Sequence, residues 1–199
     1  MFISIEGIDG AGKTSVAKKL AETLNYCYSS QKELSKYMEI DNELYLQYCH
    51  NYRKNVKSNK ESMFLLYSLS CYLSSSTDNV VCDRHLPTVY FWYGNDNSFL
   101  ISELIYSICK KPDITFILDV DINTAISNIN KKRIKNEITE KEFLRDIKKA
   151  KNATSFVSDV KTFLEHFKLN YFVIDAKNKT IDQIHDEIIS IVNCKLCAT

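Results

Sequence analysis

The chain has 199 residues, 45% of them hydrophobic, and a formal net charge of +1. This length suits one domain, residues 1–199, with a sizeable hydrophobic core. Basic and acidic residues are interspersed, so no general electrostatic field would hold a nucleic-acid backbone or a membrane surface, and we expect neither as a partner.

The first predicted element is an apolar strand from Phe2 to Glu6, and a helical pattern runs from Thr14 to Asn25. Between them lies the segment Gly7-Ile8-Asp9-Gly10-Ala11-Gly12-Lys13-Thr14, which has the spacing and context of a phosphate-binding P-loop. Glycines let successive backbone N–H groups face a phosphate, and the helix directs its positive dipole end there. Lys13 is expected to reach the β- and γ-phosphates, and the Thr14 hydroxyl to bind Mg²⁺. The segment predicts binding of a nucleoside triphosphate.

Further apolar runs predict strands at 26–29, 80–83, 114–120 and 171–175, and apolar residues at three- and four-residue spacing predict helices at 61–74, 99–109, 139–167 and 181–192. This alternation predicts an α/β protein with a buried parallel sheet and covering helices. Glu6, Asp83 and Asp119 lie at or beside the carboxyl ends of strands, where open α/β sheets bind ligands. The candidate site is therefore the rim of loops after the strands.

Asp83 and Arg84 follow the predicted strand at 80–83. A guanidinium at this place can bind a phosphate through two parallel hydrogen bonds. The same two residues could instead form an ordinary surface ion pair. The P-loop nearby favours the first interpretation.

Seven cysteines are scattered through the chain, mostly within apolar runs. An odd number without framework spacing fits reduced core thiols and predicts a cytoplasmic protein. Cys194 and Cys197 have the spacing of a metal or redox pair, but no second pair lies near them, so we assign them no function. No uninterrupted apolar run is long enough to span a bilayer.

Residues 2–14, Phe-Ile-Ser-Ile-Glu-Gly-Ile-Asp-Gly-Ala-Gly-Lys-Thr, resemble the opening of the thymidylate kinase family. Three later segments follow in the family's order: 81–85 resembles its Asp-Arg-aromatic motif, 111–120 its fourth strand, and 173–176 the loop along the adenine. The resemblance implies a three-layer P-loop NTPase fold with a five-stranded parallel sheet and helices on both faces. It also implies a homodimer that transfers the γ-phosphate of ATP to a nucleoside monophosphate with Mg²⁺, dTMP being the leading acceptor.

The resemblance also implies roles for individual residues. Asp9 would lie near the sugar and phosphate of the acceptor, Arg84 would hold phosphate between donor and acceptor, and Ala176 would border the adenine. Asp83 would join Thr14 in holding Mg²⁺, partly through water. Phosphoryl transfer needs little covalent help from a protein, so these residues would act by positioning and charge neutralisation.

The family takes an additional arginine from the P-loop or from a lid after the fourth strand. The P-loop here contains none, and the lid candidate, at about 130–139, includes Lys131-Lys132-Arg133-Ile134-Lys135. Arg133 is expected to stabilise transition-state charge, with Lys132 as the second choice. The alternative is a solvated basic helix end.

The segments that bind the acceptor in the family depart from the family's pattern in this sequence. The arginine-glutamate-proline-glycine stretch is missing after the second strand, so Lys32 or Arg53 would have to replace a phosphate ligand. The base-reading aromatic is kept as Tyr67, but Cys71 stands at the arginine position.

Thr88, Trp92 and Tyr93 are expected to line the acceptor pocket, although aromatic residues of this kind also form cores. His85 could donate a hydrogen bond to the acceptor or serve a structural role.

These departures leave two alternatives open. The chain could be a kinase on the same scaffold for another nucleotide, a nucleoside or a specialised metabolite. It could instead be an ATP-binding pseudokinase or switch. A GTPase fits less well, because no Asn-Lys-x-Asp motif follows a strand.

Overall fold

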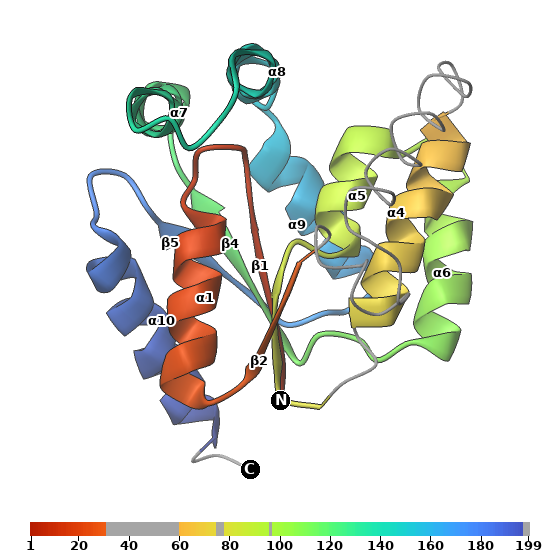
Figure 1. Ribbon diagram of the computed structural model, residues 1–199. Helices are drawn as coiled ribbons and strands as arrows, with labels where there is room; N and C mark the ends of the chain where they lie inside the picture. The colour runs from red at the N-terminus through yellow and green to blue at the C-terminus, as the bar shows by residue number, and fades with distance from the viewer. Residues whose placement is uncertain (31–59, 75–77, 96, 197–199) are drawn as a thin grey trace.

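The computed structural model describes residues 1–30, 60–74, 78–95 and 97–196 (Figure 1). The predicted roles of Lys32, Arg53 and Cys197 lie outside the described residues.

The described residues form a five-stranded sheet in the order β2-β3-β1-β4-β5, and every neighbouring pair is parallel. The strands are β1 (Phe2–Gly7), β2 (Cys27–Ser30), β3 (Val80–Asp83), β4 (Ile114–Asp119) and β5 (Tyr171–Asp175). β1 lies at the centre, and its register pairs Ile5 with Asp83 on one side and with Phe116 on the other. All five carboxyl ends therefore reach the same edge, and the predicted parallel sheet is confirmed.

Helices cover both faces of this sheet (Figure 1). One face carries α1 (Lys13–Leu24) and α10 (Ile181–Leu196), which contact each other. The other carries α5 (Leu86–Tyr93) and α9 (Phe156–His166), with α4 (Lys60–Ser74) and α6 (Ser98–Ile108) packed outside them. α7 (Ile122–Ile134) and α8 (Glu140–Lys151) pack together above the carboxyl edge. This is the predicted three-layer arrangement.

The single helix predicted over 139–167 is wrong, because α8 and α9 are separate helices. Asn152 ends α8, and the Ser155 hydroxyl at the start of α9 donates to Asp159 at 2.8 Å. Short polar side chains such as these compete with helical backbone hydrogen bonds. The break directs Phe156 into the core, where its ring meets Phe91 edge-on at 4.9 Å.

Two helices were not predicted, and local signals explain both. α5 has Pro87 in its first turn, where the missing N–H costs nothing. α7 starts after Asp121, whose carboxylate accepts from the Thr124 backbone N–H at 2.9 Å. α5 is short and α7 is rich in polar residues, so both give weak apolar periodicity. Both nevertheless contribute side chains to the site.

The core has two main clusters of buried side chains. The larger joins the sheet to α1, α10 and the inner faces of α7 and α9. The second lies among α4, α5, α6 and α9 and includes Phe64, Tyr67, Cys71, Leu86 and Phe163. Among the described residues, no helix has both the length and the apolar character that a membrane crossing requires.

Candidate active site

The P-loop turns sharply between β1 and α1. Gly10 and Gly12 adopt positive φ angles of 88° and 87°, which glycine tolerates and other residues rarely do. A Cβ atom at Gly10 would clash with the backbone carbonyl of Ala125 in α7. Asn128 of the same helix donates its amide to the Gly10 carbonyl at 3.0 Å. The glycines thus fix the loop shape and its packing against α7.

Lys13 and Thr14 begin α1 directly beneath this loop. The buried Lys13 ammonium donates to the Ile8 carbonyl at 2.6 Å, so it lies against the inner side of the P-loop. Burial and the positive charge of Arg84 lower its pKa to about 8, although the carboxylates of Asp9, Asp83 and Glu6 oppose the shift. Lys13 therefore stays mostly protonated at neutral pH, although burial makes its positive charge less favourable than it would be in water.

The Thr14 hydroxyl donates to Asp83 Oδ2 at 2.5 Å, which joins the P-loop helix to the end of β3. Asp83 is buried, and its Oδ1 atom has no hydrogen-bond partner among the described residues. A hydroxyl and a carboxylate with an unused buried oxygen are the hard oxygen ligands that Mg²⁺ prefers. These two residues therefore fit the predicted metal.

Asp9 lies between two cations. Its Oδ1 atom accepts from the Arg84 guanidinium, and its Oδ2 atom lies 4.0 Å from the ammonium of Lys149 in α8. Burial alone would raise the pKa of Asp9, but the positive charges of Arg84, Lys13 and Lys149 outweigh it and hold the pKa well below its usual range. Asp9 is therefore a carboxylate that orients the Arg84 side chain.

Glu6 holds the turn that carries Arg84. Its fully buried carboxylate accepts from the hydroxyls of Ser4 and Thr88 and from the His85 backbone N–H at 2.9 Å. Burial raises the Glu6 pKa, while these hydrogen bonds oppose the rise. Arg84 itself has a positive φ of 76°, an uncommon conformation for a non-glycine residue. Glu6 therefore has a positioning role that the sequence analysis, which placed it on the rim, did not assign.

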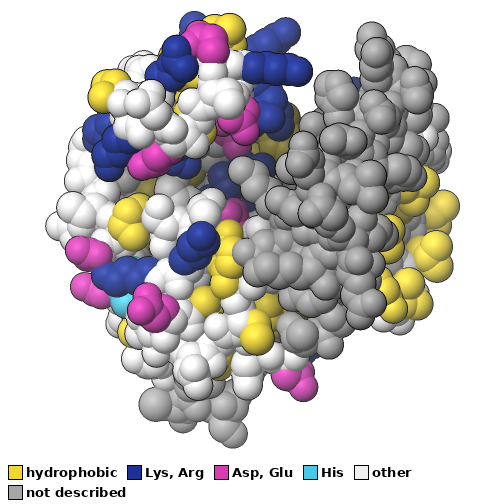
Figure 2. Space-filling view, in the orientation of Figure 1, with side chains coloured by type: hydrophobic (Ala, Val, Ile, Leu, Met, Phe, Trp, Pro, Cys, Tyr) yellow, Lys and Arg dark blue, Asp and Glu magenta, His cyan; other side chains and the backbone are white. Residues whose placement is uncertain are grey.

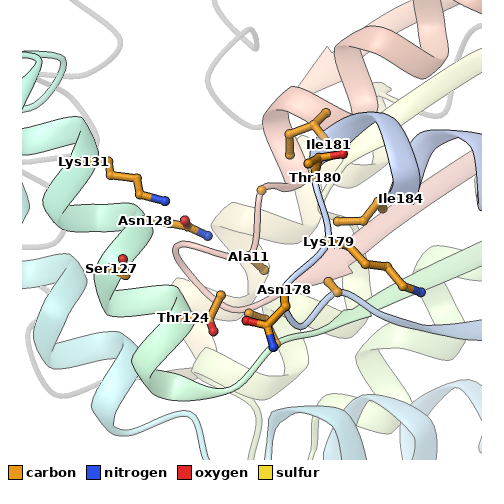
Figure 3. Close-up of a pocket in the computed structure, with 13 residues that line it drawn as sticks. Ala11, Thr124, Ser127, Asn128, Lys131, Asn178, Lys179, Thr180, Ile181 and Ile184 are labelled. Atoms are coloured by element: carbon orange, nitrogen blue, oxygen red, sulfur yellow. The ribbon is translucent and has the colours of Figure 1, made fainter.

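A cavity of about 310 Å³ lies beside the P-loop (Figure 3). Ala11 and Gly12 form one wall, α7 contributes Thr124, Asn128 and Lys131, and the loop after β5 and the start of α10 close the other side. Ala176, predicted to border the adenine, lines this cavity. The P-loop and the predicted adenine loop thus face one space.

The lid candidate spans the end of α7 and the start of α8. Arg133 pairs with Glu140, and its guanidinium carbon lies 5.8 Å from the centre of the Phe143 ring. Lys131, which the sequence analysis included in the segment without a role, lines the cavity, and Figure 3 shows its ammonium extending from α7 toward the opposite wall. Thr124, Asn128 and Lys131 recur at helical spacing, a signal that could have found them if α7 had been predicted.

The predicted acceptor residues occupy two neighbouring environments. Tyr67 and Tyr93 stack on each other at 4.9 Å between ring centres. Trp92, partly buried, packs edge-on against Phe91 and has the Lys149 ammonium 4.8 Å above its ring. Thr88 is engaged by Glu6, and His85 is completely buried, which lowers its pKa to about 4. The structure thus brings Trp92 to the Asp9 side of the P-loop and places His85 in the interior.

Three comparisons place the chain among known proteins. The family model for thymidylate kinase matches residues 5–188. A protein of Methanocaldococcus jannaschii described as a probable thymidylate kinase is 30% identical, with the alignment covering 95% of this chain and 94% of that protein. The fold resembles the thymidylate kinase of Ehrlichia chaffeensis, with a TM-score of 0.60, 20% identity and coverage of 97% and 98% of the two chains.

A second fold neighbour is the deoxyadenosine kinase of M. mycoides with bound dATP, at a TM-score of 0.58 and 22% identity. The alignment covers 97% of this chain and all of that one. At these identities the two solved structures show the fold alone. The family assignment rests on the family model and on the Methanocaldococcus jannaschii relative, both of which are matched by sequence. The chain belongs to the thymidylate kinase family.

Proposed function

We propose that the protein transfers the γ-phosphoryl group of ATP to a nucleoside monophosphate, with dTMP as the leading acceptor and dTDP as the product. The observation that carries this proposal is the convergence of Lys13, Asp9 and Arg84 at one edge of the sheet. These residues join the P-loop to an anchored guanidinium that is not among the residues lining the cavity. A transferred phosphoryl group would meet positive charge from both directions.

The residues of the P-loop and of the cavity beside it support ATP as the phosphoryl donor. The adenine would lie near Ala176, and the phosphates would follow the loop backbone toward Lys13. Thr14 and Asp83 would hold Mg²⁺, which neutralises phosphate charge when bound. The cavity lining combines small apolar residues such as Ala11 and Ala176 with Lys131 and Lys179, which suits a ligand that has an uncharged base and anionic phosphates.

Either Lys131 or Arg133 would supply the lid cation. Lys131 already faces the nucleotide cavity, whereas Arg133 must leave Glu140 to approach it. Single alanine variants separate the two. The variant that removes the functional lid cation should have a kcat at least 100-fold below the wild type and a nearly unchanged KM for ATP. The other variant should stay within a few-fold of the wild type.

The residues expected to bind the acceptor support a phosphate group as ligand more firmly than they support thymine as the base. Cys71, at the family's base-reading arginine position, is buried in the second core cluster. Losing a charged hydrogen bond to a base typically costs about 1.5–3 kcal/mol, or roughly ten- to a hundredfold in affinity. A kinase for another acceptor therefore remains the second candidate, and a nucleotide-binding switch without turnover the third.

One assay tests these candidates together: ADP release from Mg²⁺-ATP across dTMP, dUMP, UMP, CMP, AMP and thymidine. Lys13→Ala serves as the blank and should lose transfer with little change in the Tm of the ligand-free protein. Preference for dTMP supports the proposal, and preference for another acceptor supports the second candidate. ATP binding without ADP release on any of these six acceptors would refute dTMP as the acceptor and leave a kinase for a specialised metabolite or a nucleotide-binding switch.

We further infer a homodimer in the cytoplasm. α6 exposes Leu100, Leu104 and Ile108 at 69%, 66% and 66%, and α4 beside it exposes Leu65 and Leu69. In Figure 2 hydrophobic side chains gather at the edge of the molecule where α6 lies. An apolar stripe of this kind is typical of a protein interface. Sedimentation analysis tests it, with Leu104→Lys expected to shift a dimer toward monomer.

A further inference from the structure

Lys149 lies close to the reacting region although it comes from the last turn of α8. Its ammonium is 4.0 Å from Asp9 Oδ2 and 4.8 Å from the centre of the Trp92 ring. Asp9 belongs to the P-loop and Trp92 to α5, so Lys149 joins three elements that are distant in sequence. The Lys149 side chain is 29% exposed, so it is neither buried in the core nor fully solvated.

The charges around Lys149 point to an anionic ligand. The Asp9 carboxylate carries one negative charge and faces both Arg84 and Lys149. The positive charge of Lys13 also acts on this carboxylate. Three cations thus face Asp9, with Asp83 and Glu6 the further acids whose charges reach Lys13 and Arg84. A phosphate carries about two negative charges and offers several acceptor oxygens, so it complements such a cluster.

The position of Lys149 distinguishes the acceptor phosphate from those of ATP. The nucleotide cavity lies between α7 and the loop after β5, and Lys149 is not among its lining residues. Lys149 instead contacts α5, which also carries Thr88. By the family resemblance, Asp9 would lie near the sugar and phosphate of the acceptor, and Arg84 would hold phosphate between donor and acceptor. An anion held jointly by Arg84 and Lys149 would therefore be the acceptor's monophosphate.

We propose that Lys149 is a ligand of the acceptor phosphate and supplies a cation that the chain lacks at the family's arginine position after β2. This inference rests on the proposed function. Before the acceptor binds, Asp9 and the Trp92 ring hold the ammonium near its working place through a loose ion pair and a cation–π contact, each worth little at a partly exposed site. Acceptor phosphate would replace Asp9 as an anion facing the Lys149 ammonium, which can move on its flexible four-carbon stem.

The test compares a nucleotide with its nucleoside in the absence of ATP. Binding of dTMP and thymidine is measured by calorimetry for the wild type, Lys149→Gln and Lys149→Arg. A lost charged hydrogen bond predicts a dTMP Kd that rises about ten- to a hundredfold in Lys149→Gln, while the thymidine Kd and the ATP Kd change less than threefold. Lys149→Arg, which keeps the charge, should retain most of the dTMP affinity.

Lys148→Gln is the matched control, because it removes the same charge from an exposed site in the same helical turn. It should leave every Kd unchanged. An unchanged dTMP Kd in Lys149→Gln overturns the proposal, and so does an equal loss for dTMP and thymidine, which would place Lys149 on the base through Trp92. A selective loss for ATP would assign it to the donor phosphates instead.

The proposed function fails separately from this inference. Wild-type protein that binds dTMP but releases no ADP in its presence refutes phosphoryl transfer to dTMP, and the phosphate selectivity of Lys149 is still read from the binding data. If the acceptor panel favours another monophosphate, the same comparison uses that nucleotide and its nucleoside. An active wild type with an unaffected Lys149→Gln variant refutes only the role of Lys149.

Discussion

Asp9 should stabilise the ligand-free protein by compensating the positive charges of Arg84 and Lys149, which we propose to bind phosphate. In Asp9→Asn the side chain keeps its shape but loses the charge shared by Arg84 and Lys149. Breaking a buried ion pair typically costs 3–5 kcal/mol. The side chains of Asp9 and Arg84 are 12% and 25% exposed, so solvent screens part of this cost. We expect the free energy of unfolding to fall by about 2–3 kcal/mol.

For a chain of this length, each kcal/mol shifts the Tm by roughly 2–4 °C, so Asp9→Asn should melt about 4–12 °C below the wild type. Thermal denaturation is then repeated with ATP and with inorganic phosphate. An added anion replaces the missing negative charge, so both ligands should raise the Tm of Asp9→Asn more than that of the wild type.

The matched control is Asp78→Asn, which removes a carboxylate paired with Lys110 at 2.7 Å on the exposed surface. It should change the Tm far less than Asp9→Asn and should not alter the response to anions. An Asp9→Asn variant that melts with the wild type, or one whose Tm gains nothing extra from phosphate, would refute the view that Asp9 balances a phosphate-binding set of cations.

Three further predictions concern neighbouring groups. Gly10→Ala should lose about 2–4 kcal/mol of stability by chemical denaturation, because the residue has positive φ and its Cβ meets the Ala125 carbonyl; wild-type stability would contradict the packing. The ATP Kd should change little between about pH 7, above which the terminal phosphate is ionised, and the Lys13 pKa of about 8, and should rise at most tenfold per pH unit above it, since ATP binds the protonated ammonium. A Kd that falls above pH 8 would contradict this prediction. His85 is buried neutral with a pKa of about 4 against 6.5 unfolded, so it should contribute stability above pH 6.5 that declines by about 3 kcal/mol as the pH falls to 4. Replacing it in His85→Asn should flatten this decline in denaturant titrations, and an unchanged slope would show that another group causes it.

Local sequence was sufficient for the features that depend on neighbours along the chain. The glycine spacing between a strand and a helix identified the P-loop, and short apolar runs located all five described strands within about a residue. Asp83 and Arg84 could be placed at the carboxyl edge because parallel strands end together. Each of these inferences needs only local periodicity and the direction of a parallel sheet.

Local patterns could not decide how α7 and α8 present their lysines. Lys131, Lys132 and Arg133 are adjacent in sequence, but a helix separates neighbouring side chains by about 100°, so only the packing of α7 determines that Lys131 faces the cavity. The packing of α8 against α7 likewise accompanies the position of Lys149 beside Asp9 and Trp92.

The sequence by itself determined the phosphate-binding loop, the parallel sheet and the family. The tertiary structure alone decided which cations surround Asp9: Arg84 is 75 residues away along the chain, and Lys149 comes from a helix packed over the sheet's edge. The physical reason is that charge compensation depends on distance in space. No residue spacing along the chain predicts that Arg84 and Lys149 approach the two different oxygens of the Asp9 carboxylate.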